Sequence, residues 1–550
     1  MSDWNIADVW EVAADVRPDT PVLVHGARRL GWRDFERRAD GVARHLLARG
    51  CSTQDKVAQY LYNGTEYLES VFAALKAGLV PVNTNYRYVD DELVYLWDNA
   101  DVVAVVFHGT FSERIDRLRP RLPLVHAWLW IDDGSGPCPR WATPYETAAA
   151  GQDPGPVTPP QGRSGDDLLL LYTGGTTGTP KGVMWRQDDL YNALSAALFK
   201  DPRQCDLGAA RRRLAAMQPG QGPVLLCSPP LMHGMGLFTT IGALLEGGTV
   251  VTVPGRRFDA EAILDMIEAE RVTRLSIVGD AYAKPLLAAL DRHPGRWNLA
   301  SLAMITSSGV MLSQPTKEGL LRHHPDVVIA DIYGSSEAVG GGVALSRSGE
   351  AAPTARFRAG GRTRVLADDG RDVEPGSEEI GVIAVGGFQP VGYYKDPEKS
   401  ARTFRIFDGR RYSIPGDYGT VEPDGTITVL GRGSVCINTG GEKVYPEEVE
   451  EVLKLHPAVI DAVVVGVPDE RFGEIVVGLV ERAPGAALDE ADVIGHVKAR
   501  LASYKAPKRI LTVPTIGRTP SGKVDYRRLR AEATGRLAPE FPGTPVTVEP

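Results

Sequence analysis

The chain has 550 residues, more than one hydrophobic core normally serves, so two or more domains are expected. Its net charge of -9 argues against a nucleic-acid-binding protein, and its 43% hydrophobic and 24% charged residues are typical of a soluble globular protein. The five cysteines form no Cys-x-x-Cys pair, which disfavours a zinc site or a disulfide framework and suits a reducing cytoplasm.

Neither the N-terminal residues nor any internal segment predicts export or membrane insertion. The first five residues are polar and acidic, unlike a signal peptide. No uninterrupted apolar stretch reaches the roughly 18 residues that a transmembrane helix needs. We therefore expect a cytoplasmic protein without integral membrane association.

Strand and helix patterns alternate along the first part of the chain. Apolar residues at 22–24 and at Leu30 flank a Gly-containing turn, and apolar residues then recur at helical spacing from Phe35 to Leu46, before Gly50. The continuous apolar run from Val102 to Phe107 is typical of a buried parallel strand. This alternation predicts an α/β fold with a largely parallel sheet.

The middle of the chain continues this pattern between two irregular segments. Residues 151–165 are rich in Pro and Gly and predict a surface linker, and residues 200–223 are polar and predict an insertion or a mobile loop. Apolar runs at 224–226, 249–253 and 275–278 predict further strands.

A different pattern begins after Gly431. A helix is predicted from Glu447 to Leu453, and apolar runs at 463–465 and 475–477 flank a predicted turn at Pro468 to Glu470. These elements predict a compact α+β domain of roughly 120 residues.

The segment Tyr172-Thr-Gly-Gly-Thr-Thr-Gly-Thr-Pro-Lys-Gly-Val183 indicates a phosphate site. It follows the apolar run from Leu168 to Leu171, and its glycines let backbone N–H groups approach an anion closely. Its hydroxyls add donors and Lys181 adds a positive charge. The common P-loop has Lys followed by Ser or Thr, whereas Lys181 precedes Gly182, so a different phosphate chemistry is indicated.

Four further motifs follow in a fixed order. They are Tyr333-Gly-Ser-Ser-Glu337, Pro415-Gly-Asp417, Gly431-Arg432 leading to Gly440-Gly-Glu-Lys-Val-Tyr-Pro446, and Thr519-Pro-Ser-Gly-Lys523. In this order the five motifs resemble the adenylate-forming superfamily of acyl-CoA synthetases, peptide-synthetase adenylation domains and luciferases. The resemblance extends from about Thr20 to Leu529.

The resemblance implies a carboxylate attack on the α-phosphate of ATP, which gives an acyl-adenylate and pyrophosphate. It implies Mg²⁺ at Thr177 and Glu337, adenine stacking on Tyr333, a ribose contact from Asp417, and a ribose or phosphate contact from Arg432. The other nucleotide-site residues that it implies are Thr173, Gly174, Gly175, Thr176, Gly178, Lys181, Ser308, Gly309, Asp331, Gly334 and Ser336.

The catalytic residues that the resemblance implies are Lys523, Thr177, Glu337 and His233. Lys523 would bridge the substrate carboxylate and the α-phosphate. His233 would line the acyl pocket without acting as a base, because the attacking carboxylate is already ionised. Further pocket-lining residues are expected at Tyr282, Ser307, Ala338 and Gly340 to Gly342.

For the second half-reaction, relatives rotate a small C-terminal domain about a hinge. The resemblance implies a large domain at residues 1–431 with mixed and parallel sheets, a small mobile α+β domain at 432–550, and a hinge near Ser434. Many relatives have Asp or Lys at the hinge, and Ser can absorb the same backbone rotation. Gly440, Gly441 and Lys443 would line the channel for coenzyme A.

Three functions remain open at the level of the sequence. The segments at 182–188 and 431–437 resemble bacterial fatty-acyl and steroid-side-chain CoA ligases, which makes an acyl-CoA ligase for a bulky lipophilic acid the leading hypothesis. Transfer of the acyl group to a carrier protein or to an amine is the alternative on the same fold, and a non-catalytic nucleotide-binding protein is a third. The oligomeric state is not fixed by the sequence, which allows a homodimer.

Overall fold

The computed structural model describes residues 3–151, 155–173, 180–195, 206–218, 220–439, 442–469, 472–519 and 524–537, without the side chains of Arg432, Ser434 and Lys443. Contacts divide the chain into two compact units. Unit 1 comprises Met1–Ala352 and Val385–Ser413, and unit 2 comprises Pro353–Ala384 and Ile414–Pro550. The predicted domain boundary after residue 431 and the predicted hinge near Ser434 stay predictions, because both concern a rotation of one domain relative to the other.

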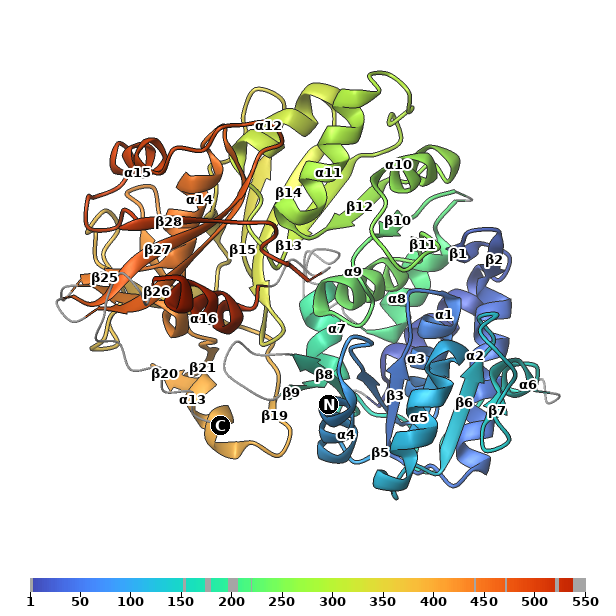
Figure 1. Ribbon diagram of the computed structural model, residues 1–550. Coiled ribbons are helices and arrows are strands. Elements are labelled where there is room, and N and C mark those ends of the chain that lie inside the picture. Colours follow the sequence, from blue (N-terminus) through green and yellow to red (C-terminus); the bar gives the residue numbers. More distant parts are fainter. Residues whose placement is uncertain are drawn as a thin grey trace. The chain divides into compact units, whose positions relative to one another are not determined.

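The first sheet of unit 1 has a parallel centre and an antiparallel edge (Figure 1). Strands β4, β3, β5 and β6 are parallel neighbours, β8 is parallel to β4, and β9 and β19 are antiparallel additions beyond β8. In spatial order the strands are β19 (Gly392–Tyr393), β9 (Lys181–Arg186), β8 (Leu168–Thr173), β4 (Val80–Asn83), β3 (Lys56–Tyr60), β5 (Val102–His108), β6 (Ala127–Ile131) and β7 (Thr143–Pro144). The strand predicted at 102–107 is confirmed as β5.

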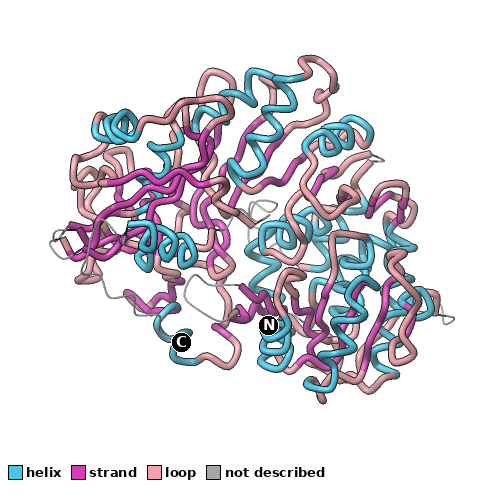
Figure 2. The backbone as a smooth tube through the Cα atoms, viewed as in Figure 1, coloured by secondary structure: helices cyan, strands magenta, loops and turns pink. Residues whose placement is uncertain are grey.

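Helices cover both faces of this sheet, as alternating side chains require. Val106 of β5 packs in one core with Phe35 of α2 and Phe72 of α3, whereas the adjacent Val105 packs in another core with Leu96 of α4. Helices and strands alternate along this part of the chain (Figure 2). The described helical segments here are α1 (Ile6–Val16), α2 (Trp32–Ala48), α3 (Thr65–Lys76), α4 (Asp90–Asn99), η1 (Gly109–Phe111), α5 (Ser112–Leu118), η2 (Arg119–Arg121), α6 (Tyr145–Ala149) and α7 (Gln187–Ser195).

A second set of unit 1 strands is also largely parallel. The neighbours in order are β2 (Arg28–Gly31), β1 (Pro21–His25), β11 (Thr249–Thr252), β10 (Val224–Cys227), β12 (Arg274–Ile277), β13 (Met304–Ser308), β14 (Val328–Ser335) and β15 (Ala338–Ser346). β1 with β2 and β14 with β15 form the antiparallel pairs. Associated helices are α9 (Gly234–Leu245), α10 (Ala260–Ala269), α11 (Gly279–Arg292) and α12 (Gln314–His323). The strands predicted at 224–226, 249–253 and 275–278 are therefore confirmed.

The expectation of an irregular segment at 200–223 is wrong for its described part. Helix α8 (Leu207–Ala215) begins after Asp206, whose side chain accepts a hydrogen bond from the Ala209 N–H. Ala210 and Leu214 are fully buried and join the same core as α1. Two apolar positions four residues apart suffice to bury one face of a short helix, although the arginines between them conceal the periodicity.

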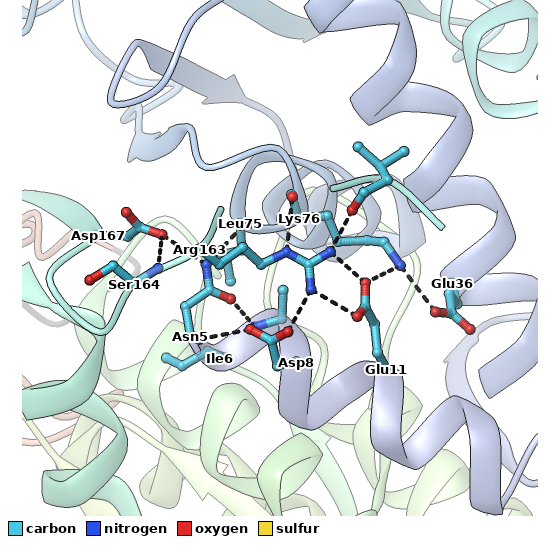
Figure 3. Close-up of polar contacts among 12 residues, drawn as sticks. Asn5, Ile6, Asp8, Glu11, Glu36, Leu75, Lys76, Arg163, Ser164 and Asp167 are labelled. Carbon is cyan, nitrogen blue, oxygen red and sulfur yellow. Dashed lines mark hydrogen bonds and ion pairs between the residues drawn. The ribbon is translucent and has the colours of Figure 1, made fainter. Parts of the chain in front are cut away.

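A buried ion cluster joins α1, α2 and the end of α3 (Figure 3). The ammonium of Lys76, whose side chain is 0% exposed, lies 2.7 Å from Glu11, 3.1 Å from Glu36 and 2.9 Å from Asp40. Arg163 donates to both oxygens of Glu11 at 2.8 and 2.7 Å. Burial opposes the charge of Lys76, yet the three carboxylates hold its pKa above the ordinary value. The cluster thus compensates charges that would be costly alone.

Unit 2 contains the predicted α+β domain. β26 (Val459–Asp469) and β27 (Gly473–Arg482) are antiparallel, and β28 (Arg509–Val513) lies parallel to β27. Val464 packs with α14 (Pro446–Lys454) and α15 (Glu490–Lys498), while Val465 faces α16 (Tyr526–Leu537). The predicted helix is confirmed as α14, but Pro468 and Asp469 end β26 rather than forming a turn, and Glu470 lies outside the described residues.

The remaining elements are shorter. In unit 2 they are β16 (Arg356–Ala359), β17 (Thr363–Leu366), β22 (Asp417–Val421), β23 (Thr426–Arg432), η4 (Gly433–Val435), β24 (Ile437–Thr439) and β25 (Glu442–Val444). Unit 1 also contains α13 (Pro397–Thr403), β20 (Phe404–Phe407) and β21 (Arg410–Ser413), and β18 (Gly381–Gly386) contains the boundary between the units.

Candidate active site

The phosphate-loop motif lies between two antiparallel strands. β8 ends at Thr173 and β9 begins at Lys181, and these two residues face each other across the pair. Lys181 Nζ lies 3.3 Å from Asp396 Oδ2. The predictions for Gly174, Gly175, Thr176, Thr177 and Gly178 fall outside the described residues. The structure therefore places Thr173 and Lys181 side by side, and the roles of the residues between them stay predictions.

Glu337 occupies the turn between β14 and β15. Its Oε1 accepts a hydrogen bond of 2.8 Å from the Tyr393 hydroxyl, and the Trp185 Nε1–H donates to the Ser336 carbonyl at 2.9 Å. Tyr393 is on β19 and Trp185 is on β9, and these two strands are paired. The edge of the first sheet therefore fixes the turn that carries Glu337 close to the strand that begins with Lys181.

A lysine that the sequence did not single out adjoins this group. Lys399, in the first turn of α13, places its ammonium 4.8 Å from the centre of the Tyr393 ring. Burial, followed by the neighbouring Lys181 ammonium, lowers the pKa of Lys399 to about 8. The carboxylates of Glu337 and Asp396 act in the opposite direction but are outweighed. Tyr393, Asp396 and Lys399 are thus additions to the residues predicted from sequence.

His233 is brought to the same region by the loop before α9. Asn63 donates to the Pro229 carbonyl at 3.0 Å and Asn83 donates to the Met232 carbonyl at 2.6 Å, which holds the loop in place. A Cβ at Gly234 would lie 3.1 Å from Leu171 and 3.4 Å from the Ser336 hydroxyl. Gly234 is therefore tightly packed against β8 and the Glu337 turn, which places its neighbour His233 beside both.

The nucleotide-site residues after β13 and on β14 are neighbours in the sheet. Ser308 pairs with Ile332, which precedes Tyr333, and Gly309 follows with φ of +88°. Gly334 lies between Tyr333 and the Glu337 turn. The pairing of β13 with β14 therefore brings Ser308 and Gly309 close to Tyr333, although more than twenty residues separate them in the sequence.

Asp331 is a buried residue that lies beside a buried lysine. It is 3% exposed, and its carboxylate Oδ2 lies 3.9 Å from the ammonium of Lys317, which is also buried. This placement supports a role in balancing a buried charge. The nucleotide contact predicted for Asp331 stays a prediction.

Two of the expected acyl-pocket residues, Tyr282 and Gly341, are packed against aromatic rings. Tyr282 is 3% exposed and meets the ring of Phe258 edge-on at 4.5 Å. A Cβ at Gly341 would lie 2.9 Å from the Tyr333 ring and 3.1 Å from Val385. A side chain added at Gly341 would therefore displace the tyrosine proposed to stack on adenine, and the acyl-pocket role of Gly341 stays a prediction.

In unit 2, Asp417 and Arg432 face each other across strands β22 and β23. The Asp417 residue is 9% exposed, and the Arg432 side chain is outside the described part. The predictions for Ser434 and Lys443 as side chains, and for Gly440, Gly441 and Lys523, also fall outside it. The structure therefore shows that Asp417 and Arg432, the two residues predicted to contact the ribose, are paired on neighbouring strands.

Side-chain hydrogen bonds hold the segments before and after residues 520–523. Arg518 donates to both oxygens of Asp461 at 2.6 and 2.9 Å. After the gap, the Tyr526 hydroxyl donates to Glu450 Oε1 at 3.1 Å. Asp461 is on β26 and the buried Glu450 is on α14, so Arg518 and Tyr526 are each tied to the folded body of unit 2.

No group of three or more His, Cys, Asp or Glu side chains among the described residues could hold a metal ion. Within the same ranges, the helices are too short or too polar to span a membrane.

Family profiles match most of the chain. The profile of the AMP-binding enzymes matches residues 10–394, and that of the AMP-binding enzyme C-terminal domain matches residues 448–523. The medium/long-chain-fatty-acid–CoA/3-oxocholest-4-en-26-oate–CoA ligase of Mycobacterium tuberculosis is 42% identical over 99% of this chain and 98% of its own length. The 3-oxocholest-4-en-26-oate–CoA ligase of Rhodococcus rhodochrous is 39% identical, with 98% and 97% covered.

Solved structures show the same fold. ATP-bound MatB from Rhodopseudomonas palustris superposes with a TM-score of 0.78 and 27% identity, covering 96% of this chain and 99% of that one. The anthranilate–CoA ligase AuaEII with anthranoyl-AMP gives a TM-score of 0.82 at 23% identity, covering 98% and 100%.

Proposed function

Since the chain belongs to the family of AMP-binding enzymes, we propose that it is an ATP-dependent acyl-CoA ligase. It would convert a carboxylic acid, ATP and CoA into acyl-CoA, AMP and pyrophosphate. The observation that carries this proposal is the 42% identity, over nearly the whole length of both chains, to an enzyme named as a CoA ligase. The grouping of Lys181, Glu337 and His233 in unit 1 supports it.

The chemical difficulty of the first step is charge, because a carboxylate must approach a polyanion. An oxygen of the acid bonds to the α-phosphorus and pyrophosphate leaves, so positioning and charge neutralisation supply most of the catalysis. Lys181, at the end of the phosphate loop, would hold the departing phosphates, and Lys523 would neutralise charge at the α-phosphate. No general base is required, which fits the proposed lining role of His233.

The residues at the Glu337 turn fit Mg²⁺ although the part of the chain that the structure describes holds no cluster of three candidate metal ligands. Mg²⁺ usually keeps several waters and takes one or two protein carboxylates plus phosphate oxygens. Glu337 offers one carboxylate, and its hydrogen bond from Tyr393 at 2.8 Å orients it. When bound, the ion would neutralise the negative charge of the phosphates.

The nucleotide would stack its adenine on Tyr333, and the Asp417 carboxylate would accept from the ribose hydroxyls beside Arg432. A carboxylate has two acceptor oxygens, so it can serve two neighbouring hydroxyls. Ser308, Gly309, Gly334 and Ser336 would form the polar edge around the base and phosphates.

We expect Gly341→Ala to weaken ATP use without changing acid selectivity. The added Cβ would lie 2.9 Å from the Tyr333 ring, which must shift, and overpacking of this kind costs about 1–3 kcal/mol. The KM for ATP should rise about tenfold with a short and with a bulky acid alike. Gly242→Ala, where a Cβ meets nothing within 4 Å, is the matched control. A loss confined to the bulky acid would contradict this expectation and support the acyl-pocket role of Gly341.

In the second step the CoA thiol attacks the acyl carbonyl, and AMP leaves with the oxygen that bonded to phosphorus. We propose that the C-terminal domain rotates between the steps about Ser434, and that Gly440, Gly441 and Lys443 then line the channel for pantetheine and the CoA phosphates.

Ser434→Pro is expected to separate the two steps. Proline fixes φ and removes an N–H, so it should restrict the rotation. Pyrophosphate release should remain near normal, while thioester formation should fall at least tenfold, about 1.4 kcal/mol of barrier. Ser434→Ala should behave like the wild type. If thioester formation kept pace with adenylation in the proline variant, rotation about this residue would be the wrong mechanism.

A fatty or steroid-type acid is the proposed substrate, because the relatives at 39–42% identity are named for such acids. We also propose a cytoplasmic location, where ATP and CoA are supplied. The test is a pyrophosphate-release screen over short, medium, long, aromatic and steroid carboxylates, each with CoA, a carrier protein or an amine as acceptor. CoA-dependent turnover of lipophilic acids is expected, and turnover only with an amine or a carrier would contradict the proposal.

A further inference from the structure

The segment that joins β19 to α13 holds Lys399 in a fixed position. The Asp396 carboxylate accepts a hydrogen bond of 3.0 Å from the Lys399 backbone N–H at the start of α13. The Ser400 hydroxyl accepts from the Tyr393 N–H at 2.8 Å and donates to the Asp396 carbonyl at 2.7 Å. Because β19 is paired with β9, the lysine is fixed relative to Lys181.

Lys181 and Lys399 are neighbours around Asp396, whose carboxylate contacts the Lys181 ammonium and the Lys399 backbone N–H. Burial and the Lys181 ammonium lower the pKa of Lys399, whereas the Glu337 and Asp396 carboxylates raise it. Lys181 is paired with Asp396 at 3.3 Å. Among the described residues, Lys399 forms no ion pair with a carboxylate, and its ammonium instead faces the Tyr393 ring at 4.8 Å.

This arrangement is costly unless an anion binds there. Like charges repel at this range, and a cation in the first turn of a helix opposes the helix dipole. Neither feature helps α13 to fold. Both cations lie at the end of the proposed phosphate loop, where an anion with several oxygens could accept hydrogen bonds from each of them.

We propose that Lys399 is a second phosphate-binding cation, which acts beside Lys181 on the β- and γ-phosphates of ATP and on pyrophosphate. Tyr393 is the positioning residue of the group, since its hydroxyl orients Glu337 and its ring faces Lys399. The inference rests on the proposed function and adds a residue to its site.

The test is calorimetric binding to the full chain with three probes: ATP with Mg²⁺, inorganic pyrophosphate with Mg²⁺, and AMP. Lys399→Met should raise the Kd of ATP and of pyrophosphate about tenfold and leave the Kd of AMP within about twofold, because AMP lacks the β- and γ-phosphates. Lys399→Arg should restore much of the affinity. Lys395→Met is the matched control, because Lys395 lies in the same segment but pairs with Asp101 at 2.7 Å.

Kinetics provide a second measurement. In Lys399→Met the KM for ATP should rise while the KM values for acid and CoA, the thermal midpoint and the conversion of preformed acyl-adenylate stay unchanged. Unaltered pyrophosphate and ATP affinity in this variant, or an equal loss for AMP, would overturn the inference. A wild-type protein that binds neither ATP nor pyrophosphate would overturn the proposed function and this inference with it.

Discussion

Lys523→Ala is expected to lower the rate of adenylation about a hundredfold or more and to leave the transfer step intact. In the proposed mechanism its ammonium meets negative charge only where the acid attacks the α-phosphate, and loss of one such preorganised donor typically costs 10²- to 10³-fold. The measurement is acid-dependent pyrophosphate release, followed by acyl-CoA formation from synthetic acyl-adenylate and CoA.

Lys508→Ala is the matched control for this experiment. Lys508 is an exposed lysine of the same unit, with its ammonium 5.6 Å from the Phe472 ring, and both steps should be unaffected. Equal loss of adenylation and transfer in Lys523→Ala would show that the lysine has another role, such as supporting the fold of the C-terminal unit.

Lys76→Met should lower the free energy of unfolding by about 3–5 kcal/mol. Removal of one partner from a buried ion cluster leaves uncompensated charges, and here Glu11, Glu36 and Asp40 would lose their shared cation. Denaturant unfolding, or thermal inactivation where unfolding is irreversible, provides the measurement. Lys395→Met removes an ion pair of a half-exposed lysine and should cost less than about 1 kcal/mol.

The pH dependence separates a charge effect from a packing effect. Burial already raises the pKa of Glu36 in the presence of Lys76. Without that cation the folded-state pKa of Glu36 should rise further above its unfolded value, so the folded variant takes up a proton at Glu36 before the unfolded chain does as the pH falls. The difference in the free energy of unfolding between wild type and Lys76→Met should therefore become smaller as the pH falls. A deficit that is constant with pH would indicate lost packing alone.

The sequence predicts the elements whose patterns are strong and local. The continuous apolar run of β5 and the amphipathic spacing of α2 both became the expected elements. Helix α8 was missed because only Ala210 and Leu214 mark its buried face, and three consecutive arginines hide it. Burial against α1 decides that helix, and burial depends on the tertiary fold.

The sequence motifs predicted individual residues of the candidate site, but they did not predict which other residues lie beside them. Glu337 and Lys181 belong to recognisable motifs, whereas Tyr393 and Lys399 join them only because β19 pairs with β9. A lysine in the first turn of α13 was the available signal, since it opposes the helix dipole. The direction of Gly341 toward Tyr333 depends on strand register, which no local pattern encodes.

The most direct test of the account follows an isotope from acid to nucleotide. A carboxylic acid labelled with ¹⁸O in both carboxylate oxygens is incubated with the enzyme, ATP, Mg²⁺ and CoA, and the products are analysed by mass spectrometry. Attack on the α-phosphate predicts AMP that carries one ¹⁸O atom, formed in equal amount with acyl-CoA and unlabelled pyrophosphate. Formation of ADP with labelled inorganic phosphate, or unlabelled AMP, would contradict acyl-adenylate formation and with it the proposed function.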